Sequence, residues 1–515
     1  MVLRQMVLRH VTGAVLVLVC AAGAWGAPLK VVFVTGSAEY DSDTSMPAYE
    51  RWLEAHYDVD VTLLKANGWE DLPGLEALET CDTALFFTRR LRISGEQLER
   101  VKRYLGGGKP IVAVRTASHG FQGFLEFDKE VAGGNYRNHL PDGPTLESFV
   151  VPGAAQHPIL AGVGPIKSRC SVYRTGPLAA DTQELLHVKT MDGKQPIFWM
   201  RGKTKEGKPI HEDADQPLAW TREHKGGRVF YVALGNVQDF ENAAFQRLIA
   251  NGLFWTARRE PEAKPLPPVP TRVVKSAEIA LPVQQRKHGG AERATLNASN
   301  TALILCDVWD MHWCAPASER LDALVPRMEE VVRACRAAGI AVIHAPSDTM
   351  AFYEGTIPRR RMQEAPQAPA PQEQKCETPR LPIDDSDGGC TDNSLEPYSA
   401  WTRQHAGISI DDVDGVSDSG REVYNYLAAN GITNLLVMGV HTNMCVLNRG
   451  FAIRQMTRWG ISCYLVRDLT DTMYDPEDPP KVSHDEGTDL VVKYIEEHYA
   501  PSLLSADLLS ALPKP

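Results

Sequence analysis

The chain has 515 residues, of which 43% are hydrophobic and 23% are charged, and its formal net charge at pH 7 is -11. This composition suits a globular protein of roughly two to four domains and excludes an intrinsically disordered chain. The acidic excess also argues against a nucleic-acid-binding protein, because such proteins cluster lysine and arginine on one face.

The first segment, residues 1–26, has the pattern of a secretory signal peptide. Arg4 and Arg9 precede an apolar stretch from Val11 to Ala24, and small residues stand just before Ala27. The stretch is short for a membrane-spanning helix. We therefore expect cleavage, no stable membrane span afterwards, and a secreted or periplasmic mature protein.

The cysteines show no metal-binding spacing. Of the ten cysteines, Cys20 would leave with the signal peptide, and the nine that remain include no C-x-x-C pair. In an oxidising compartment we expect Cys376 and Cys390, which flank a segment rich in proline and aspartate, to form a disulfide. The odd number of cysteines leaves at least one free thiol, which is compatible with a reactive Cys445.

Residues 27–258 alternate between strand-like and helix-like segments. Short apolar segments predict strands at residues 30–36, 59–65, 83–88, 109–116 and 227–236. Helical spacing predicts helices at residues 46–56, 94–108 and 242–258, the second with a serine at its start and glycines at its end. Such alternation predicts a parallel sheet that helices cover on both faces.

A segment without periodicity follows, from Arg259 to Asn300. It is rich in proline and charge, as in "EPEAKPLPPVPTRVVK". We interpret it as an extended linker between two domains.

Residues 301–515 repeat the alternating pattern. Strands are expected at 301–307, 340–346, 434–440 and 461–468, and helices at 318–339, 419–431, 445–459 and 487–499. The stretch from Met350 to Pro397 is longer than an ordinary loop and predicts a lid or an insertion. The predicted fold class is therefore α/β, with two doubly wound three-layer domains joined by a Pro-rich linker.

Polar side chains gather where the strands of the second domain end. The carboxyl ends of parallel strands meet at one edge, where open α/β sheets bind ligands. Any one of these residues alone could be structural, but a thiol, carboxylates and imidazoles at one edge suit a nucleophilic or a metal site. The residues are Asp307, Asp310, His312, His344, His441, Thr442, Asn443, Cys445, Asp468 and Asp471.

Two motifs, "ALILCD" before residue 308 and "GVHTNMCV" around Cys445, resemble those of the isochorismatase-like cysteine hydrolases. That family includes nicotinamidases and other amide hydrolases, and the resemblance covers about residues 301–501. It implies that Cys445 attacks a carbonyl carbon and that Asp307 acts as the base. It also implies that backbone N–H groups around a non-proline cis peptide, Val440–His441, hold the oxyanion.

The family's third catalytic residue is a lysine before the helix "SGREVYNYL", and no lysine stands between Lys375 and Lys481. Another positive charge would then have to favour the thiolate. Arg403, Arg421, a protonated histidine or a divalent metal could replace the lysine. A histidine, His441 or His312, ranks above a metal, because three ligands at metal spacing are not visible. The metal candidates are Asp310, His312 and His344.

In the first half, "HPILAGV", "PLAWTREHKGGRVFYVALGN" and "NGLFWTA" resemble the trehalose-utilisation family, whose fold is similar to class I glutamine amidotransferases. The turn where such amidotransferases carry a cysteine holds Ser118 and His119 instead. Amidotransferase chemistry is therefore not expected. We expect Arg115, His119 and Trp220 to line a pocket for a sugar, or else to be structural.

Together these resemblances predict a secreted or periplasmic two-domain protein. The C-terminal domain would hydrolyse a C–N or related bond of a small molecule, and the N-terminal domain would bind carbohydrate. The expected partners are a small-molecule substrate related to carbohydrate and further copies of the chain, without nucleic acid. The catalytic candidates are Cys445, Asp307 and His441, and the expected substrate contacts in this domain are Trp309, His312, His344 and Asn443.

The alternative is a non-catalytic carbohydrate-binding or scaffolding protein whose sites have degenerated. Catalysis requires Asp307 within hydrogen-bond reach of the Cys445 thiol. A cysteine sealed in apolar packing would favour the alternative.

Overall fold

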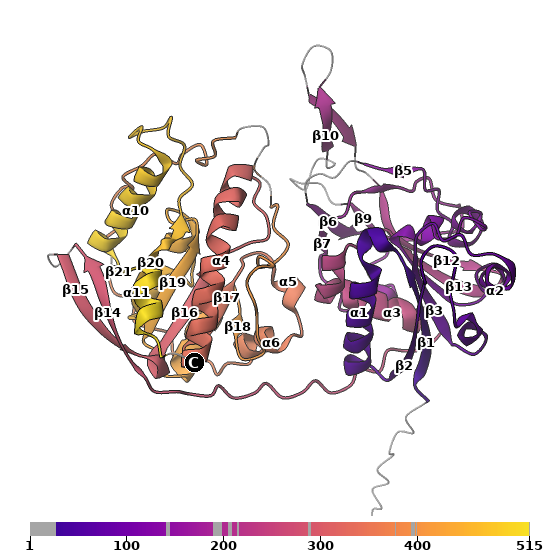
Figure 1. Cartoon of the computed structure of the whole chain (residues 1–515), viewed down its shortest axis with the longest axis horizontal. Coiled ribbons are helices and arrows are strands. Elements are labelled where there is room, and N and C mark those ends of the chain that lie inside the picture. The colour runs from indigo at the N-terminus through magenta and orange to yellow at the C-terminus, as the bar shows by residue number, and fades with distance from the viewer. Residues whose placement is uncertain are drawn as a thin grey trace, which may run out of the picture.

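The computed structural model describes residues 27–140, 145–188, 198–203, 209–213, 216–286, 290–375, 377–392, 397 and 399–513. Two α/β domains lie side by side, joined by an extended segment (Figure 1). The expected signal peptide, residues 1–26, lies outside the described residues. Among the helices of the described part, none has the length and apolar character needed to cross a membrane.

The N-terminal domain is built on a nine-stranded sheet in the order β2-β1-β3-β4-β13-β12-β9-β6-β7. The first five strands run parallel, and the other four continue the sheet antiparallel. The strands of this sheet are β1 (Leu29–Gly36), β2 (Val59–Lys65), β3 (Thr83–Thr88), β4 (Ile111–Val114), β6 (Leu146–Val150), β7 (Lys167–Ser168), β9 (Gln183–Val188), β12 (Pro217–His224) and β13 (Gly227–Val232). Two further pairs form separate two-stranded sheets: β5 (Asn138–His139) with β8 (Tyr173–Arg174), and β10 (Phe198–Lys203) with β11 (Pro209–Asp213).

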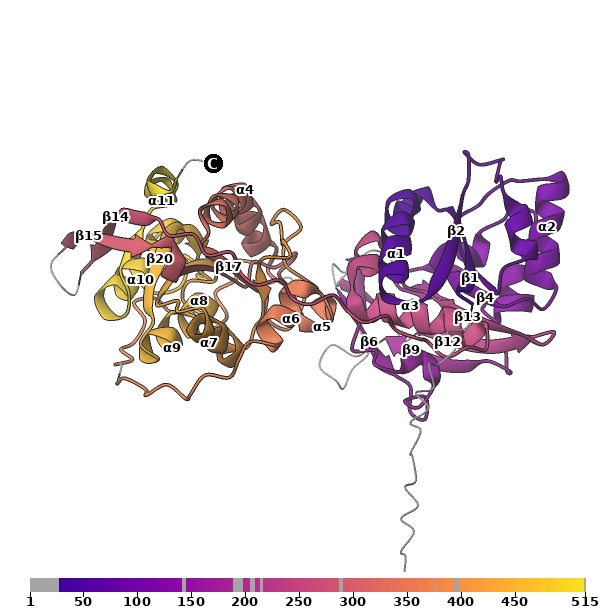
Figure 2. The ribbon, with the colours of Figure 1, turned by 90° about the horizontal axis from the view of Figure 1, so that it is seen from below.

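Helices cover both faces of this sheet (Figure 2). Apolar residues of α1 (Ser42–His56) and α3 (Ala243–Thr256) pack on one face, and those of α2 (Gly95–Gly106) pack on the other. Asn242 caps α3 by accepting hydrogen bonds from two N–H groups of its first turn. Every residue of β3 is buried, as expected for a parallel strand between two helical layers.

The C-terminal domain has an eight-stranded sheet in the order β15-β14-β21-β20-β19-β16-β17-β18. The strands β16 to β21 are parallel, and the hairpin β14–β15 extends one edge through β14, which pairs antiparallel with β21. The strands are β14 (Glu278–Gln285), β15 (Gly290–Asn297), β16 (Thr301–Cys306), β17 (Ala341–Ala345), β18 (Gly415–Val416), β19 (Asn434–Val440), β20 (Ser462–Asp471) and β21 (Ser502–Leu503).

Here too helices pack on both faces, so the expected three-layer α/β architecture is confirmed in both domains. One core contains residues of α4 and α11, and the other contains residues of α7, α8, α9 and α10. The helices are α4 (Ala315–Ala338), α5 (Met350–Tyr353), α6 (Ile357–Gln363), α7 (Gly420–Ala429), α8 (Cys445–Asn448), α9 (Ile453–Arg458), α10 (His484–His498) and α11 (Ser505–Ala511).

The expected linker from Arg259 to Asn300 contains the hairpin β14–β15, so the segment without helix or strand ends before Glu278. In β14 the buried residues Ile279, Leu281 and Val283 alternate with exposed ones, which is the period-2 signal of a half-buried strand. The remaining segment is attached to the C-terminal domain, for example through the Arg361 guanidinium, which donates to the Pro270 carbonyl over 2.7 Å.

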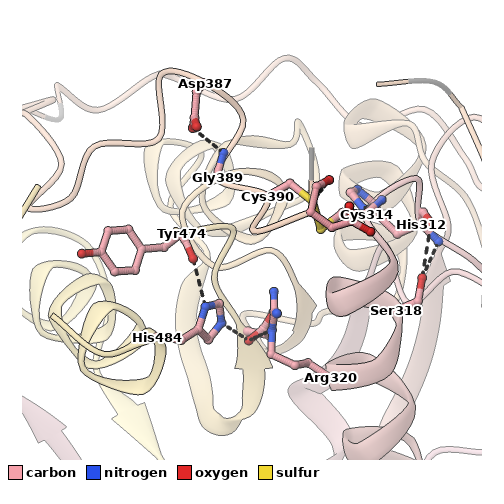
Figure 3. The surroundings of a disulfide bond; sticks show 11 residues. His312, Cys314, Ser318, Arg320, Asp387, Gly389, Cys390, Tyr474 and His484 are labelled. Atoms are coloured by element: carbon pink, nitrogen blue, oxygen red, sulfur yellow. Dashed lines mark hydrogen bonds and ion pairs between the residues drawn. A yellow bond between two sulfur atoms is a disulfide. The ribbon is translucent and has the colours of Figure 1, made fainter. Parts of the chain in front are cut away.

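A disulfide fixes the long segment after α6. It joins Cys390 to Cys314, which lies 76 residues earlier, at the turn that precedes α4 (Figure 3). The expected Cys376–Cys390 pairing is therefore wrong, and Cys376 itself lies outside the described residues. The segment from Met350 to Pro397 includes the short helices α5 and α6 before its long irregular part.

Candidate active site

Two neighbouring parallel strands bring the chemical groups together. Asp307 follows β16, and the turn that leads to Cys445 follows the adjacent strand β19. The peptide Val440–His441 is cis, as the family resemblance implied. Gly439 has φ 125° and lies so close to β16 that a Cβ atom there would be 2.0 Å from the Cys306 carbonyl oxygen. Only glycine therefore fits at the end of β19.

The Cys445 thiol and the Asp307 carboxylate are joined by a hydrogen bond. The backbone N–H of Ser347 donates to Asp307 Oδ1 over 2.8 Å. The backbone N–H of His441 donates to the sulfur. Asp307 has φ 51°, a strained conformation for a residue with a side chain. The carboxylate is thus held in place on the thiol from several directions.

Arg449 supplies the positive charge of this site. Its Nε lies 2.9 Å from Asp307 Oδ2, and its Nη2 lies 3.8 Å from Asp348 Oδ2. Arg449 stands four residues after Cys445, so both side chains leave the same side of the turn. The sequence analysis considered Arg403 and Arg421 and missed Arg449. Its spacing from Cys445 was the available signal.

Burial sets the protonation of the pair. It raises the pKa of Cys445 far above that of a free thiol; the Asp307 charge adds to the increase, and Arg449 opposes it. Burial also raises the pKa of Asp307, again with Arg449 opposing. The thiol therefore keeps its proton at neutral pH, and Asp307 is placed to accept that proton as the sulfur attacks.

The two histidines near the turn are neutral. Burial lowers the pKa of His312 to about 4 and that of His441 to about 3. Their rings lie 5.0 Å apart, centre to centre. The expectation that one of these imidazoles supplies the missing positive charge is therefore wrong. The contribution of His441 is its backbone N–H.

An aromatic stack lies beside the turn. The indoles of Trp309 and Trp401 are 4.0 Å apart at 9°, and the His312 ring stacks on Trp401 at 5.8 Å. Trp309 is buried, and its Nε1 donates to the Ser347 carbonyl over 3.0 Å. Trp309 and His312 thus lie near the site. Trp309, however, is buried and contacts Ser347, whose N–H binds Asp307.

The three candidate metal ligands do not converge. Asp310 accepts hydrogen bonds from the Thr402 N–H over 2.8 Å and from its hydroxyl over 2.6 Å. His312 Nδ1 accepts from the Cys314 N–H over 3.2 Å. His344 is buried, and its Nε2 lies 3.2 Å from Asp414 Oδ2. These residues do not fit a metal ion, and no other ligand cluster occurs in the part of the chain that the structure describes. His344 cannot touch substrate.

Cys445 opens into a cavity of about 430 Å³, whose lining includes Asn443, Arg449 and Asp385. Asn443 Nδ2 donates to Asp385 Oδ2 over 2.7 Å, and thereby ties the long loop to the turn. The thiol is only partly buried and is not sealed in apolar packing. The geometry therefore favours catalysis over a degenerate site.

Of the three residues expected to bind a sugar in the N-terminal domain, Arg115 and Trp220 are buried and His119 is partly exposed. Arg115 has φ 44° and is buried, with its guanidinium between the rings of Tyr40 and Tyr173 at 4.5 and 4.2 Å. His119 is partly exposed and stacks on Tyr136 at 4.6 Å.

Trp220 has no exposed surface, and its Nε1 donates to the Ala132 carbonyl over 2.8 Å. Arg115 and Trp220 are thus structural, as the alternative interpretation of the sequence had it, and the expectation that they line a sugar pocket is wrong.

Comparison with known protein families agrees with the division of the chain into two domains. The family model ThuA, described as trehalose utilisation, matches residues 30–256, and the isochorismatase domain model matches residues 301–481. Comparison with curated proteins gave no match.

Solved structures similar to each half were also found. A ThuA-like protein from Parabacteroides merdae is 16% identical, covers 47% of this chain and 95% of its own, and has a TM-score of 0.34. A cysteine hydrolase from Pseudomonas syringae is 16% identical, with 42% and 93% coverage and a TM-score of 0.29. An isochorismatase from Pseudomonas putida is 14% identical, with 41% and 91% coverage and a TM-score of 0.27.

Proposed function

Because this chain joins a ThuA-like domain to an isochorismatase-like domain, we propose that its C-terminal half hydrolyses a C–N or related bond of a small molecule. The observation that carries the proposal is the chain of contacts from Cys445 through Asp307 to Arg449. A nucleophile, a base and a group that orients the base are the parts that covalent catalysis requires.

In the proposed reaction the Cys445 sulfur attacks the carbonyl carbon while Asp307 takes the thiol proton. The carbonyl π electrons move to oxygen, and backbone N–H groups of the Val440–His441 turn stabilise the oxyanion. As the C–N bond breaks, Asp307 returns the proton to the leaving amine. Water then attacks the thioester with Asp307 again as base, the acid leaves, and the thiol regains its proton.

Asp307→Asn tests this assignment through two opposite effects. Loss of the base should reduce hydrolysis of responsive substrates from a panel of small amides and esters by about 10²–10⁴-fold. Loss of the negative charge should lower the Cys445 pKa, so its alkylation by iodoacetamide should move to lower pH by about one unit or more. Cys445→Ala serves as the unreactive control. An unchanged alkylation profile would show that the two groups are not coupled.

The proposal for the N-terminal domain is carbohydrate binding. It is supported by the partly exposed rings of His119 and Tyr136, which stack on each other beside the positive charges of Arg89 and Arg90. Calorimetric titration with trehalose and glucose, compared with Tyr136→Ala, tests it. Heats that Tyr136→Ala leaves unchanged would refute this site.

The protein is proposed to be secreted or periplasmic. The pattern of residues 1–26 and the Cys314–Cys390 disulfide support this, because disulfides persist in oxidising compartments. N-terminal sequencing of exported protein should begin at Ala27. Cytoplasmic retention of the full chain would refute the proposal.

A further inference from the structure

The two domains together enclose a second cavity, of about 310 Å³. Glu147, Lys167 and Asn242 line it from the N-terminal domain, and Asp348, Thr349 and Ser399 line it from the C-terminal domain. Ala351 and Phe352 of the lining belong to α5, which lies on the side of the C-terminal domain that faces the N-terminal domain (Figure 1, Figure 2). Neither domain alone forms this cavity.

Hydrogen bonds and an ion pair between the two domains connect the segments around this cavity. The Lys167 ammonium donates to the Asp348 carbonyl over 3.1 Å and to the Ser399 hydroxyl over 2.8 Å. The Thr145 hydroxyl donates to the Ala400 carbonyl, and Arg403 pairs with Glu241. Lys167 therefore binds two segments of the C-terminal domain at once.

The cavity adjoins the thiol site through Asp348. The Asp348 carboxylate lies 3.8 Å from Arg449, which lines the Cys445 cavity and pairs with Asp307. The preceding residue, Ser347, donates its N–H to Asp307. Asp348 thus lines one cavity and contacts a lining residue of the other, and a molecule whose carbonyl meets Cys445 would have to pass it to reach Lys167.

The lining indicates what such a molecule carries. The lining combines two carboxylates, an ammonium, an amide and hydroxyls with the apolar side chains of Pro165, Ala351 and Phe352. Alcohol groups, which donate and accept at the same time, fit this mixture. An anionic group would face the carboxylates of Glu147 and Asp348. The volume is at the lower end of the range for small-molecule pockets, which is about 300–1,000 Å³.

We propose that the cavity between the domains is a second subsite of the cysteine site, which takes an uncharged, hydroxyl-rich group about the size of one sugar ring. The inference rests on the proposed hydrolase function. Lys167 and Glu147 then act as specificity residues that the N-terminal domain contributes to the reaction of the C-terminal domain. This explains why the two domains occur in one chain.

A pair of alkylating reagents tests the subsite in the full chain. Iodoacetamide and N-iodoacetylglucosamine share one reaction, in which the Cys445 sulfur bonds to the CH₂ carbon, iodide leaves and the thiol proton passes to Asp307 or to solvent. Mass spectrometry gives the rate at Cys445 for each reagent. We expect the sugar reagent to saturate and to react at least about tenfold faster at low concentration, because remote binding accelerates the step.

Lys167→Met and Ser399→Ala should bring the ratio of the two rates close to one, and Lys167→Arg should retain part of the difference. Lys225→Met is the matched control, since the Lys225 ammonium donates to the Gly106 carbonyl within the N-terminal domain. Its ratio should equal that of the wild type.

Equal, non-saturating rates for both reagents in the wild type would overturn the subsite. So would a ratio that Lys167→Met and Lys225→Met change equally. Hydrolysis of the amide panel by the same protein would then show that the proposed function stands without the subsite. No alkylation of Cys445 by either reagent, with no hydrolysis of the panel, would overturn both.

Discussion

Asp307 is the residue on which the site depends, because it touches the thiol, the Ser347 backbone and the Arg449 guanidinium. A carboxylate this deeply buried requires a counter-charge. Arg449 provides it from the turn that carries the nucleophile, whereas the family places a lysine on another segment. A cation therefore lies beside the Asp307 carboxylate, from a different place in the chain than the lysine that the family resemblance implied.

Two substitutions of Arg449 should distinguish the effect of its charge on the Cys445 thiol from the effect of its shape. In Arg449→Gln the Cys445 pKa should rise by at least about one unit, and alkylation by iodoacetamide at pH 7 should slow about tenfold. Arg449→Lys keeps the charge and should recover most of the rate. Equal rates in the two variants would show that the charge of Arg449 does not act on the thiol.

The buried histidines should make the C-terminal domain sensitive to acid. Burial lowers the pKa of His441 from 6.5 to about 3, so the unfolded chain binds a proton that the folded chain does not, and stability falls as pH drops below 6.5. Between pH 7 and pH 5 this should cost about 2 kcal/mol of unfolding free energy. His441→Gln should remove that part of the decrease in chemical denaturation. A variant with the wild-type pH dependence would contradict it.

Residues in the local motif could be predicted from the sequence, and residues whose partners are distant could not. Cys445, Asp307 and the cis peptide were predicted through the family resemblance that two short motifs carry. Arg449 was missed because its partner Asp307 is 142 positions away. Trp220 and His344 were misplaced because burial depends on the packing of whole layers.

At the scale of elements, the close contact of β16 and β19 holds the site together. Gly439 at the end of β19 lets the two strands approach, and Asp307 and the cysteine turn leave them side by side. The strands were predictable from their apolar runs. The expected single helix at 445–459 is split into α8 and α9, whose four and six residues give weak periodic signals. The hairpin β14–β15 was read as linker although β14 alternates, because it follows a segment rich in proline and charge.

Gly439→Ala should therefore be severely destabilising. The new Cβ would lie 2.0 Å from the Cys306 carbonyl oxygen, and φ 125° is unfavourable for alanine. We expect a loss of at least about 3 kcal/mol of unfolding free energy, or insoluble protein. Gly431→Ala is the control, because φ is 63° there but no atom lies within 4 Å, and should cost only about 1 kcal/mol. Similar losses in both variants would refute the close-contact argument.

At the scale of the whole molecule, the disulfide and the domain contacts restrain the long loop from two ends. Cys390 is tied to Cys314, and ten residues later Ala400 and Trp401 lie against the N-terminal domain. The two-domain division could be predicted from the alternation of segments and the break between them. The contact between the domains could not, because it depends on single polar residues such as Lys167 and Glu241.

Removing the disulfide should lower the stability of the C-terminal domain strongly. A loop of 76 residues corresponds to about 4.5 kcal/mol in the chain-entropy model. Cys314→Ser, Cys390→Ser and the double variant should lose similar amounts in chemical denaturation, since each removes the same bond. Non-reducing peptide mapping should show the Cys314–Cys390 peptide pair. A double variant as stable as the wild type would contradict the pairing.

The parallel indoles of Trp309 and Trp401 provide an intrinsic spectroscopic probe of this part of the molecule. Two such chromophores at 4.0 Å couple their electronic transitions and produce a paired positive and negative band in ultraviolet circular dichroism. Trp401 also faces the Lys167 ammonium of the other domain at 5.9 Å. Because Ser399, Ala400 and Arg403 also contact the N-terminal domain, a separation of the domains that displaces Trp401 would change the amplitude of that band without any added dye.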